Sequence, residues 1–162
     1  MVIKGGQKKI VLVDLDVVTV AFWDKSENAD KGRSLLGQIA RGEVAMATPH
    51  YLLSHLEKWR HITLKEKIEN YYLKNSRVML TNEDVDERVA KVGLDDKKLL
   101  RELQAHGIKE EDAFLVMVSS IFSLDCLVTF NRVHLRKNEN TINEVLQKYG
   151  IQPIRIVGPE QV

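Results

Sequence analysis

The stretch KKIVLVDLDVV at residues 8–18 decides the fold of this chain. Residues 8–13 (KKIVLV) are rich in β-branched side chains and run directly into an acid, Asp14, with a second acid at Asp16. A short apolar run bounded by polar residues is typical of a strand that is buried in a sheet. We therefore expect a buried strand here, with acidic side chains at its carboxyl end.

Further strands and several helices are predicted along the rest of the chain. Further short strands are predicted at residues 44–47, 77–80, 126–129 and 153–157. Helices are predicted at residues 17–23, 31–41, 49–60, 63–73, 83–92, 95–105, 110–124 and 141–149. Thr48 followed by Pro49 is a helix-start signal, because the hydroxyl can accept from the first turn and proline suits the first helical position. Residues 24–30 (DKSENAD) are polar enough to form a loop.

This alternation of strands and helices predicts an α/β fold. We expect a central parallel sheet flanked by helices on both faces, that is, an α/β/α sandwich. The length of 162 residues fits one domain of ordinary size, so residues 1–162 are predicted to form a single domain. The helix at residues 110–124 should be buried, because its apolar side chains surround almost the whole circumference.

Charge and cysteine content limit the classes of function. The formal net charge is only +1, so any binding of nucleic acid must come from a local patch. Cys126 is the only cysteine, which excludes a disulfide within the chain and a cysteine-rich zinc site. The apolar run near the N-terminus is too short for a membrane span and is interrupted by Asp14 and Asp16. We therefore expect a cytoplasmic protein without a targeting or membrane segment.

Three polar side chains are predicted to converge at one edge of the sheet. Asp14 follows the first strand, and Asn131 follows the strand at residues 126–129. Asp112 lies in the first turn of the helix that leads into that strand. Loops at the carboxyl ends of parallel strands meet in one crevice, and Mg²⁺ and Mn²⁺ prefer oxygen ligands of this kind. Asp14 and Asp112 are thus the candidate metal ligands, with Asn131 beside them.

Each of these residues also has a structural interpretation. Asp112 could simply favour the positive end of its helix, which stabilises a protein by about 0.3–1 kcal/mol at an exposed site. Asp14 and Asp16 could be turn or helix-cap residues, and Asn131 is a common residue after a strand. Only the convergence of the three positions therefore points to a metal.

Beyond these residues, the sequence is similar to the PIN-domain family, which includes the toxin nucleases of toxin–antitoxin pairs. The matching stretches are VLVDLDVV at 11–18, TPHYLLSHLEKW at 48–59, EEDAFLVMVSS at 110–120, DCLVTFNRVHL at 125–135 and INEVLQKYGIQPIRIVGPEQV at 142–162. The resemblance implies a PIN-like α/β/α domain acting as an Mg²⁺- or Mn²⁺-dependent endoribonuclease, often a homodimer. It also implies RNA as the substrate and an antitoxin protein as a partner of the toxin members.

The family's acidic positions can be carried over one by one. The first acid falls on Asp14, with Asp16 in a supporting position, and the acid of the later helix falls on Asp112. The acid of the second motif should fall near Ser54, which cannot replace a carboxylate; Glu57, one turn further, is either its substitute or a solvated helix residue. The fourth acid is replaced by Asn131, a neutral ligand that lowers the negative charge of the site.

Basic and aromatic residues near these positions are weaker candidates. Arg132 and His134 follow the strand at 126–129 and could contact phosphates, or they could form a solvated basic loop. Trp59 and the tyrosines at 71 and 72 are predicted to be packing residues rather than platforms for bases. The remaining histidines show no metal-binding pattern and are interpreted as surface or packing residues; they are His50, His55, His61 and His106.

Two other functions compete with the nuclease. DLDVVT at 14–19 resembles the first motif of haloacid-dehalogenase-like phosphatases, but no aspartate occurs after Asp125 to complete their metal site. That alternative is rejected. The stronger rival is a catalytically weak or inactive PIN-like module that binds RNA or a protein, and its support is the replacement of two acids by Ser54 and Asn131.

Overall fold

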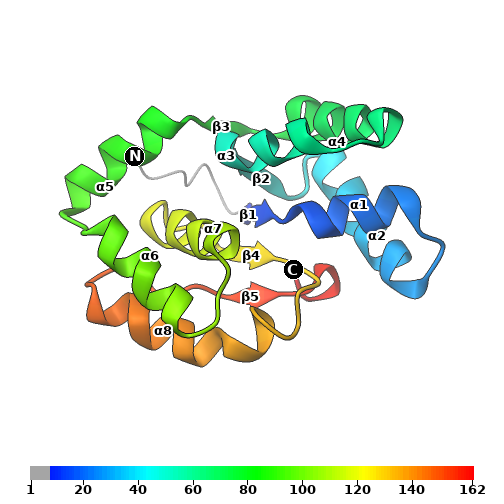
Figure 1. Cartoon of the computed structure of the whole chain (residues 1–162). Coiled ribbons are helices and arrows are strands. Elements are labelled where there is room, and N and C mark those ends of the chain that lie inside the picture. Colours follow the sequence, from blue (N-terminus) through cyan, green and yellow to red (C-terminus); the bar gives the residue numbers. More distant parts are fainter. Residues whose placement is uncertain (1–7) are drawn as a thin grey trace.

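One parallel sheet forms the centre of the molecule. The computed structural model describes residues 8–162, so residues 1–7 of the N-terminal segment considered above for targeting lie outside the described residues. The sheet has five strands in the order β3-β2-β1-β4-β5, and every neighbouring pair is parallel (Figure 1). The strands are β1 (Ile10–Val13), β2 (Ala45–Pro49), β3 (Val78–Leu80), β4 (Cys126–Val128) and β5 (Ile156–Val157).

The central strand is β1, as its sequence predicts. All four of its residues are buried, and it pairs with β2 on one side and β4 on the other. Val11 is aligned with both Met46 and Cys126 in these two pairings. A strand covered on both faces needs apolar side chains at every position rather than at alternate ones. The run IVLV therefore specifies the middle of the sheet.

Helices connect the strands and fall into two groups. In residues 8–162 they are α1 (Leu15–Trp23), α2 (Glu27–Ala40), α3 (His50–Ser54), α4 (Ile62–Asn75), α5 (Asn82–Val92), α6 (Asp96–Ala105), α7 (Glu110–Ile121) and α8 (Glu139–Lys148), with short 3₁₀ turns η1 (His55–Lys58), η2 (Arg136–Asn138) and η3 (Pro159–Gln161). Helix α1 contacts α2 and α4, whereas α6 contacts α7 and α8. The predicted α/β fold with an all-parallel sheet is confirmed, and the two helix groups are consistent with an α/β/α sandwich.

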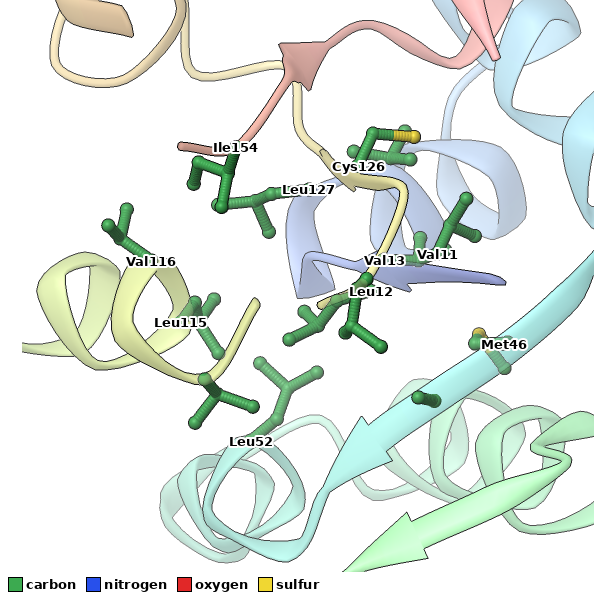
Figure 2. Close-up of a cluster of buried hydrophobic side chains, with 14 of the residues drawn as sticks. Val11, Leu12, Val13, Met46, Leu52, Leu115, Val116, Cys126, Leu127 and Ile154 are labelled. Atoms are coloured by element: carbon green, nitrogen blue, oxygen red, sulfur yellow. The ribbon is translucent and has the colours of Figure 1, made fainter. Parts of the chain in front are cut away.

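Helix α7 is the most deeply buried helix, as predicted from its continuous apolar surface. Every residue from 115 to 121 is buried. Figure 2 shows Leu115 of α7 and Leu52 of α3 in the same apolar cluster as Leu12 of β1. Burying a leucine fully stabilises a fold by about 1.5–3 kcal/mol relative to leaving it exposed. This packing fixes α7, and with it the acidic first turn of the helix, against the end of β1.

Three local predictions were wrong. Helix α2 begins at Glu27, inside the predicted loop, because the Ser26 hydroxyl accepts a hydrogen bond from the amide of Ala29 and caps the helix. Thr48 is not a helix cap: it lies in β2, and its hydroxyl is 2.6 Å from that of Ser76. The helix predicted at residues 49–60 is split into α3 and η1.

The helices were also compared with the length and apolarity that a membrane span requires. In residues 8–162, no helix is long and apolar enough to cross a bilayer.

Candidate metal centre

The candidate site lies at the carboxyl ends of β1 and β4. Chain order reverses between these strands, because β2 and β3 lie on one side of β1 while β4 and β5 lie on the other. Such a switch point opens a crevice beyond the strand ends. The amide of Asp14 donates to the carbonyl of Val128 at 2.9 Å, so the ladder between the two strands continues up to the first acidic residue.

Asp14 and Asp16 share one hydroxyl group. Thr129, the first residue after β4, has its Oγ1 atom 3.0 Å from Oδ2 of Asp14 and 3.2 Å from Oδ2 of Asp16. The amide of Phe130 also donates to Oδ2 of Asp16, at 3.1 Å. Asp14 and Asp16 are therefore both oriented by the residues that directly follow β4.

Asp112 is joined to the same group through Asn131. The side-chain amide nitrogen of Asn131 donates to Oδ2 of Asp112 at 3.2 Å, and its oxygen accepts from the amide of His134 at 3.0 Å. The backbone amide of Asn131 donates to Oγ1 of Thr129 at 3.0 Å. One continuous network thus connects the two acids after β1 with the acid of α7.

A buried tyrosine fixes the end of β1. The hydroxyl of Tyr72, on α4, donates to the carbonyl oxygen of Val13 at 2.7 Å, and both groups are buried. This carbonyl immediately precedes Asp14, so the hydrogen bond holds the backbone from which the first acid projects.

The acids form a concentrated negative charge. Burial, together with the nearby charges of Asp16 and Asp112, raises the pKa of Asp14 to about 8. Burial raises the pKa of Asp16 to about 6, and burial followed by the charge of Glu111 raises the pKa of Asp112. Within residues 8–162, none of these three carboxylates forms a salt bridge with lysine or arginine. Removing a carboxylate from water without a cationic partner is costly, so a bound cation would stabilise this arrangement.

One buried carboxylate oxygen has no hydrogen-bond partner in residues 8–162. Oδ1 of Asp16 is buried and accepts no hydrogen bond within the described part of the chain. Buried polar atoms are nearly always satisfied, and this unsatisfied oxygen is the observation that best fits a missing cation or its water. Over residues 8–162, no three His, Cys, Asp or Glu side chains are gathered into a preformed ligand set. Magnesium does not require one, since it commonly binds through one or two carboxylates plus waters.

A cavity of about 560 Å³ opens beside the three acids. Its lining includes Asp14, Asp16, Asp112, Glu111, Thr19, Tyr51, His55, Lys58, Trp59 and the apolar residues Leu15, Val20, Leu52 and Leu115. This volume lies within the range of roughly 300–1,000 Å³ that is usual for ligand sites. The lining therefore combines acidic groups with aromatic and aliphatic groups.

The structure does not bring Glu57 to this cavity. Glu57 is exposed, and together with Ser54 it lines a separate cavity of about 260 Å³. The Ser54 hydroxyl donates to the carbonyl of Tyr51 at 2.6 Å. The expectation that Glu57 supplies the acid missing at Ser54 is corrected accordingly, because Ser54 and Glu57 share a face of this segment that lines the separate cavity rather than the one beside the acids.

The basic residues after β4 lie outside the cavity. Arg132 and His134 are exposed and are absent from the lining. The charge of His134 counteracts part of the rise in the pKa of Asp112, so His134 is close to that acid. His134 therefore lies near Asp112 at the surface, whereas Arg132 is exposed and forms no salt bridge with the acids in the described part of the chain.

Sequence reasoning missed three residues of the site: Thr129, Tyr51 and His55. His55 lines the cavity, its Nδ1 atom is 3.7 Å from Oε1 of Glu111, and its Nε2 atom is buried without a partner in residues 8–162. The signal was present, because residues 51, 55 and 59 are spaced by four and so share one helical face. For Thr129, no sequence pattern indicated that its hydroxyl would serve two acids.

Comparisons with protein-family models, with curated proteins and with solved structures found no match to this chain. The likeness to the PIN-domain family rests on the motifs quoted above.

Proposed function

We propose that this chain is a PIN-like ribonuclease that hydrolyses phosphodiester bonds with the help of Mg²⁺ or Mn²⁺. The observation that carries the proposal is the meeting of Asp14, Asp16 and Asp112 at the switch point of the sheet without a lysine or arginine partner in residues 8–162. Paired carboxylates beside a cavity are the kind of group that hard divalent cations bind.

Asp14 and Asp112 are the proposed ligands, and Asp16, whose Oδ1 is buried without a partner in residues 8–162, lines the same cavity. A divalent cation bound there would supply a more acidic water and would neutralise charge on a phosphodiester. The role of the chain is to hold the acids in place. Thr129 orients Asp14 and Asp16, and Asn131 orients Asp112.

Protons and the cation compete for the same oxygens. Because the pKa of Asp14 is raised to about 8 by burial and neighbouring acids, this carboxyl holds a proton at neutral pH in the metal-free protein. Metal ligands must be deprotonated, so binding of the cation releases that proton. We therefore expect both metal affinity and activity to rise with pH between about 6 and 8.

The biological setting comes from the resemblance. RNA as the substrate, an antitoxin protein as a partner, a homodimer and a cytoplasmic location are all proposed on that basis. Lys58 lines the cavity, His134 is exposed near Asp112, and Arg132 is exposed in the segment after β4. These three side chains are suited to contact the phosphates of an RNA strand.

A second candidate is a PIN-like module that binds RNA or a protein without cutting. One observation favours it: Ser54 and Glu57 line a different cavity, so α3 brings no carboxylate to the acids. The remaining ligands would then bind a cation only weakly.

A cleavage assay separates the two candidates. The wild-type protein is incubated with labelled RNA and Mn²⁺, with and without chelator, next to Asp14→Asn and the control Asp86→Asn, an exposed acid on α5. We expect cleavage that stops with chelator, is absent in Asp14→Asn and persists in Asp86→Asn. Cleavage that survives chelator, or that Asp14→Asn retains, rejects the nuclease; RNA binding without any cleavage supports the binding module.

A further inference from the structure

The large cavity is lined by aromatic residues as well as by acids. Tyr51 and Trp59 line it, and the chain that joins them turns from α3 into η1. The Tyr51 ring is held on two sides, because its centroid lies 4.2 Å from that of Phe114 and 4.7 Å from that of His55. A side chain packed in this way presents a fixed flat surface.

We propose that the aromatic lining formed by Tyr51, His55 and Trp59 is a subsite for one unpaired nucleobase next to the acids. The inference rests on the proposed function and specifies its substrate as single-stranded RNA. Proteins that bind single strands stack bases on aromatic side chains while basic groups follow the backbone. Here the aromatic lining, one lysine and the acids are parts of one cavity.

The lining fits a base better than it fits a charged or sugar group. Leu15, Leu52 and Leu115 supply aliphatic surface, and these residues come from three different helices. Thr19 has already committed its hydroxyl to the carbonyl of Leu15, at 2.7 Å. The flat faces of a base can replace water against such a surface without leaving polar groups unpaired.

Few polar groups are left to distinguish one base from another. In residues 8–162, Nε2 of His55 is the one buried side-chain nitrogen of the cavity lining that has no hydrogen-bond partner. Recognition through stacking tolerates all four bases, since every base has a π face. We therefore expect weak sequence preference at this subsite.

The same cavity should reject duplex RNA. A base within a duplex is stacked on both faces and paired along its edge, so it must leave the helix before it can enter a pocket. The rim carries one cation, Lys58, whereas Glu111 adds a negative charge. This rim offers too little positive charge to hold a duplex by its backbone alone.

Binding is tested without cleavage in the Asp14→Asn background. The probe is a fluorescein-labelled RNA octamer, single-stranded or annealed to its complement, and fluorescence anisotropy gives the dissociation constant at one fixed salt concentration. Trp59→Leu and Tyr51→Leu are compared with Trp23→Leu, a matched control because Trp23 is 63% exposed and lies outside the cavity lining. We expect the two cavity variants to bind the single strand on the order of tenfold more weakly, and the control to bind it normally.

A second measurement leaves the aromatic residues of the cavity unchanged. In a Trp23→Phe protein that also carries Asp14→Asn, Trp59 is the only tryptophan, and its fluorescence should be quenched by the single strand and much less by an abasic octamer. Equal binding of single strand and duplex, equal quenching by the abasic octamer, or no RNA binding would overturn the subsite. Manganese-dependent cleavage by the wild type is measured separately. The proposed function can therefore fail while base-dependent binding remains, and the base subsite can fail while cleavage remains.

Discussion

The hydroxyl of Thr129 lies between two carboxylates, 3.0 Å from Oδ2 of Asp14 and 3.2 Å from Oδ2 of Asp16. A threonine hydroxyl has one proton to donate, so it can satisfy only one ionised acid at a time. Thr129 follows β4, whereas both acids follow β1. This single side chain therefore connects the two strand ends on which the candidate site is built.

Thr129→Val should destabilise the protein in a pH-dependent manner. The substitution keeps the shape of the side chain but removes the donor from two largely buried acids, which costs about 1–3 kcal/mol. The loss should be greater at pH 8 than at pH 5, because an ionised carboxylate needs the donor more than a protonated one. Thermal unfolding at both pH values measures it, with Thr19→Val as the control, since that hydroxyl binds a helix carbonyl. An equal loss at both pH values would contradict this role.

The stability of the metal-free protein should fall as pH rises from about 4 to 8. The pKa of Asp14 is raised from 3.8 to about 8 and that of Asp16 to about 6, so the folded state keeps protons that the unfolded state has already released. When the folded state binds more protons, the free energy of unfolding decreases with pH. Chemical denaturation across this range should give a flatter profile for Asp14→Asn, and a curve as steep as wild type would reject the assignment.

Manganese should reverse this trend. Since the cation needs ionised ligands, its stabilising effect should be largest near pH 8 and small near pH 5. The unfolding midpoint with and without Mn²⁺ at the two pH values provides the measurement. A stabilisation independent of pH would indicate that Mn²⁺ binds elsewhere.

Much of the fold could be predicted, because the pattern of apolar residues in a short segment indicates whether that segment is buried. The apolar run of β1 and the continuous apolar surface of α7 each specify the centre of a layered α/β protein, and both predictions agree with the structure. Element boundaries were less predictable. Thr48 has the chemistry of a helix cap, but its partner is the Ser76 hydroxyl, 28 residues away, which local patterns cannot reveal.

A carboxylate at position 55 should strengthen the site, whereas one at position 54 should not. His55 lines the cavity beside the acids, but Ser54 lines another cavity. His55→Glu is therefore expected to tighten Mn²⁺ binding about tenfold, equal to about 1.4 kcal/mol, and to lower stability without metal through repulsion. Ser54→Glu and Glu57→Gln should leave Mn²⁺ affinity unchanged. If Ser54→Glu raised the Mn²⁺ affinity and His55→Glu did not, position 54 rather than position 55 would lie beside the acids.

The site itself could be predicted only in part. Strand ends and helix starts are visible in sequence, so the meeting of Asp14, Asp112 and Asn131 followed from topology. The hydrogen bonds between them could not be predicted. The side-chain nitrogen of Asn131 donates to Asp112, and its side-chain oxygen accepts from the backbone amide of His134. Glu57 does share a face with Ser54, as its spacing predicts, but that face lines a different cavity from the one beside the acids, which local spacing cannot reveal.

Tyr72→Phe should weaken both the fold and the site. It leaves the buried carbonyl of Val13 without its donor, which costs about 1–3 kcal/mol, or roughly 2–12 °C in unfolding temperature at this chain length. Tyr71→Phe is the matched control, because that hydroxyl donates to the carbonyl of Leu36, far along the chain from the acids. Both variants should lose stability, but only Tyr72→Phe should also lower Mn²⁺ affinity; identical affinities would limit Tyr72 to a structural role.

The most direct test of the central claim is a calorimetric titration of the metal-free protein with Mn²⁺ at pH 8. We expect one site in the wild type and in Asp86→Asn, and affinities lower by at least about tenfold in Asp14→Asn and Asp112→Asn, since even indirect partners of a metal contribute that much. If Asp112 only stabilised its helix, Asp112→Asn would lower thermal stability and leave the Mn²⁺ affinity unchanged. Absence of binding heat in the wild type, or equal affinity in Asp14→Asn, would contradict the metal centre.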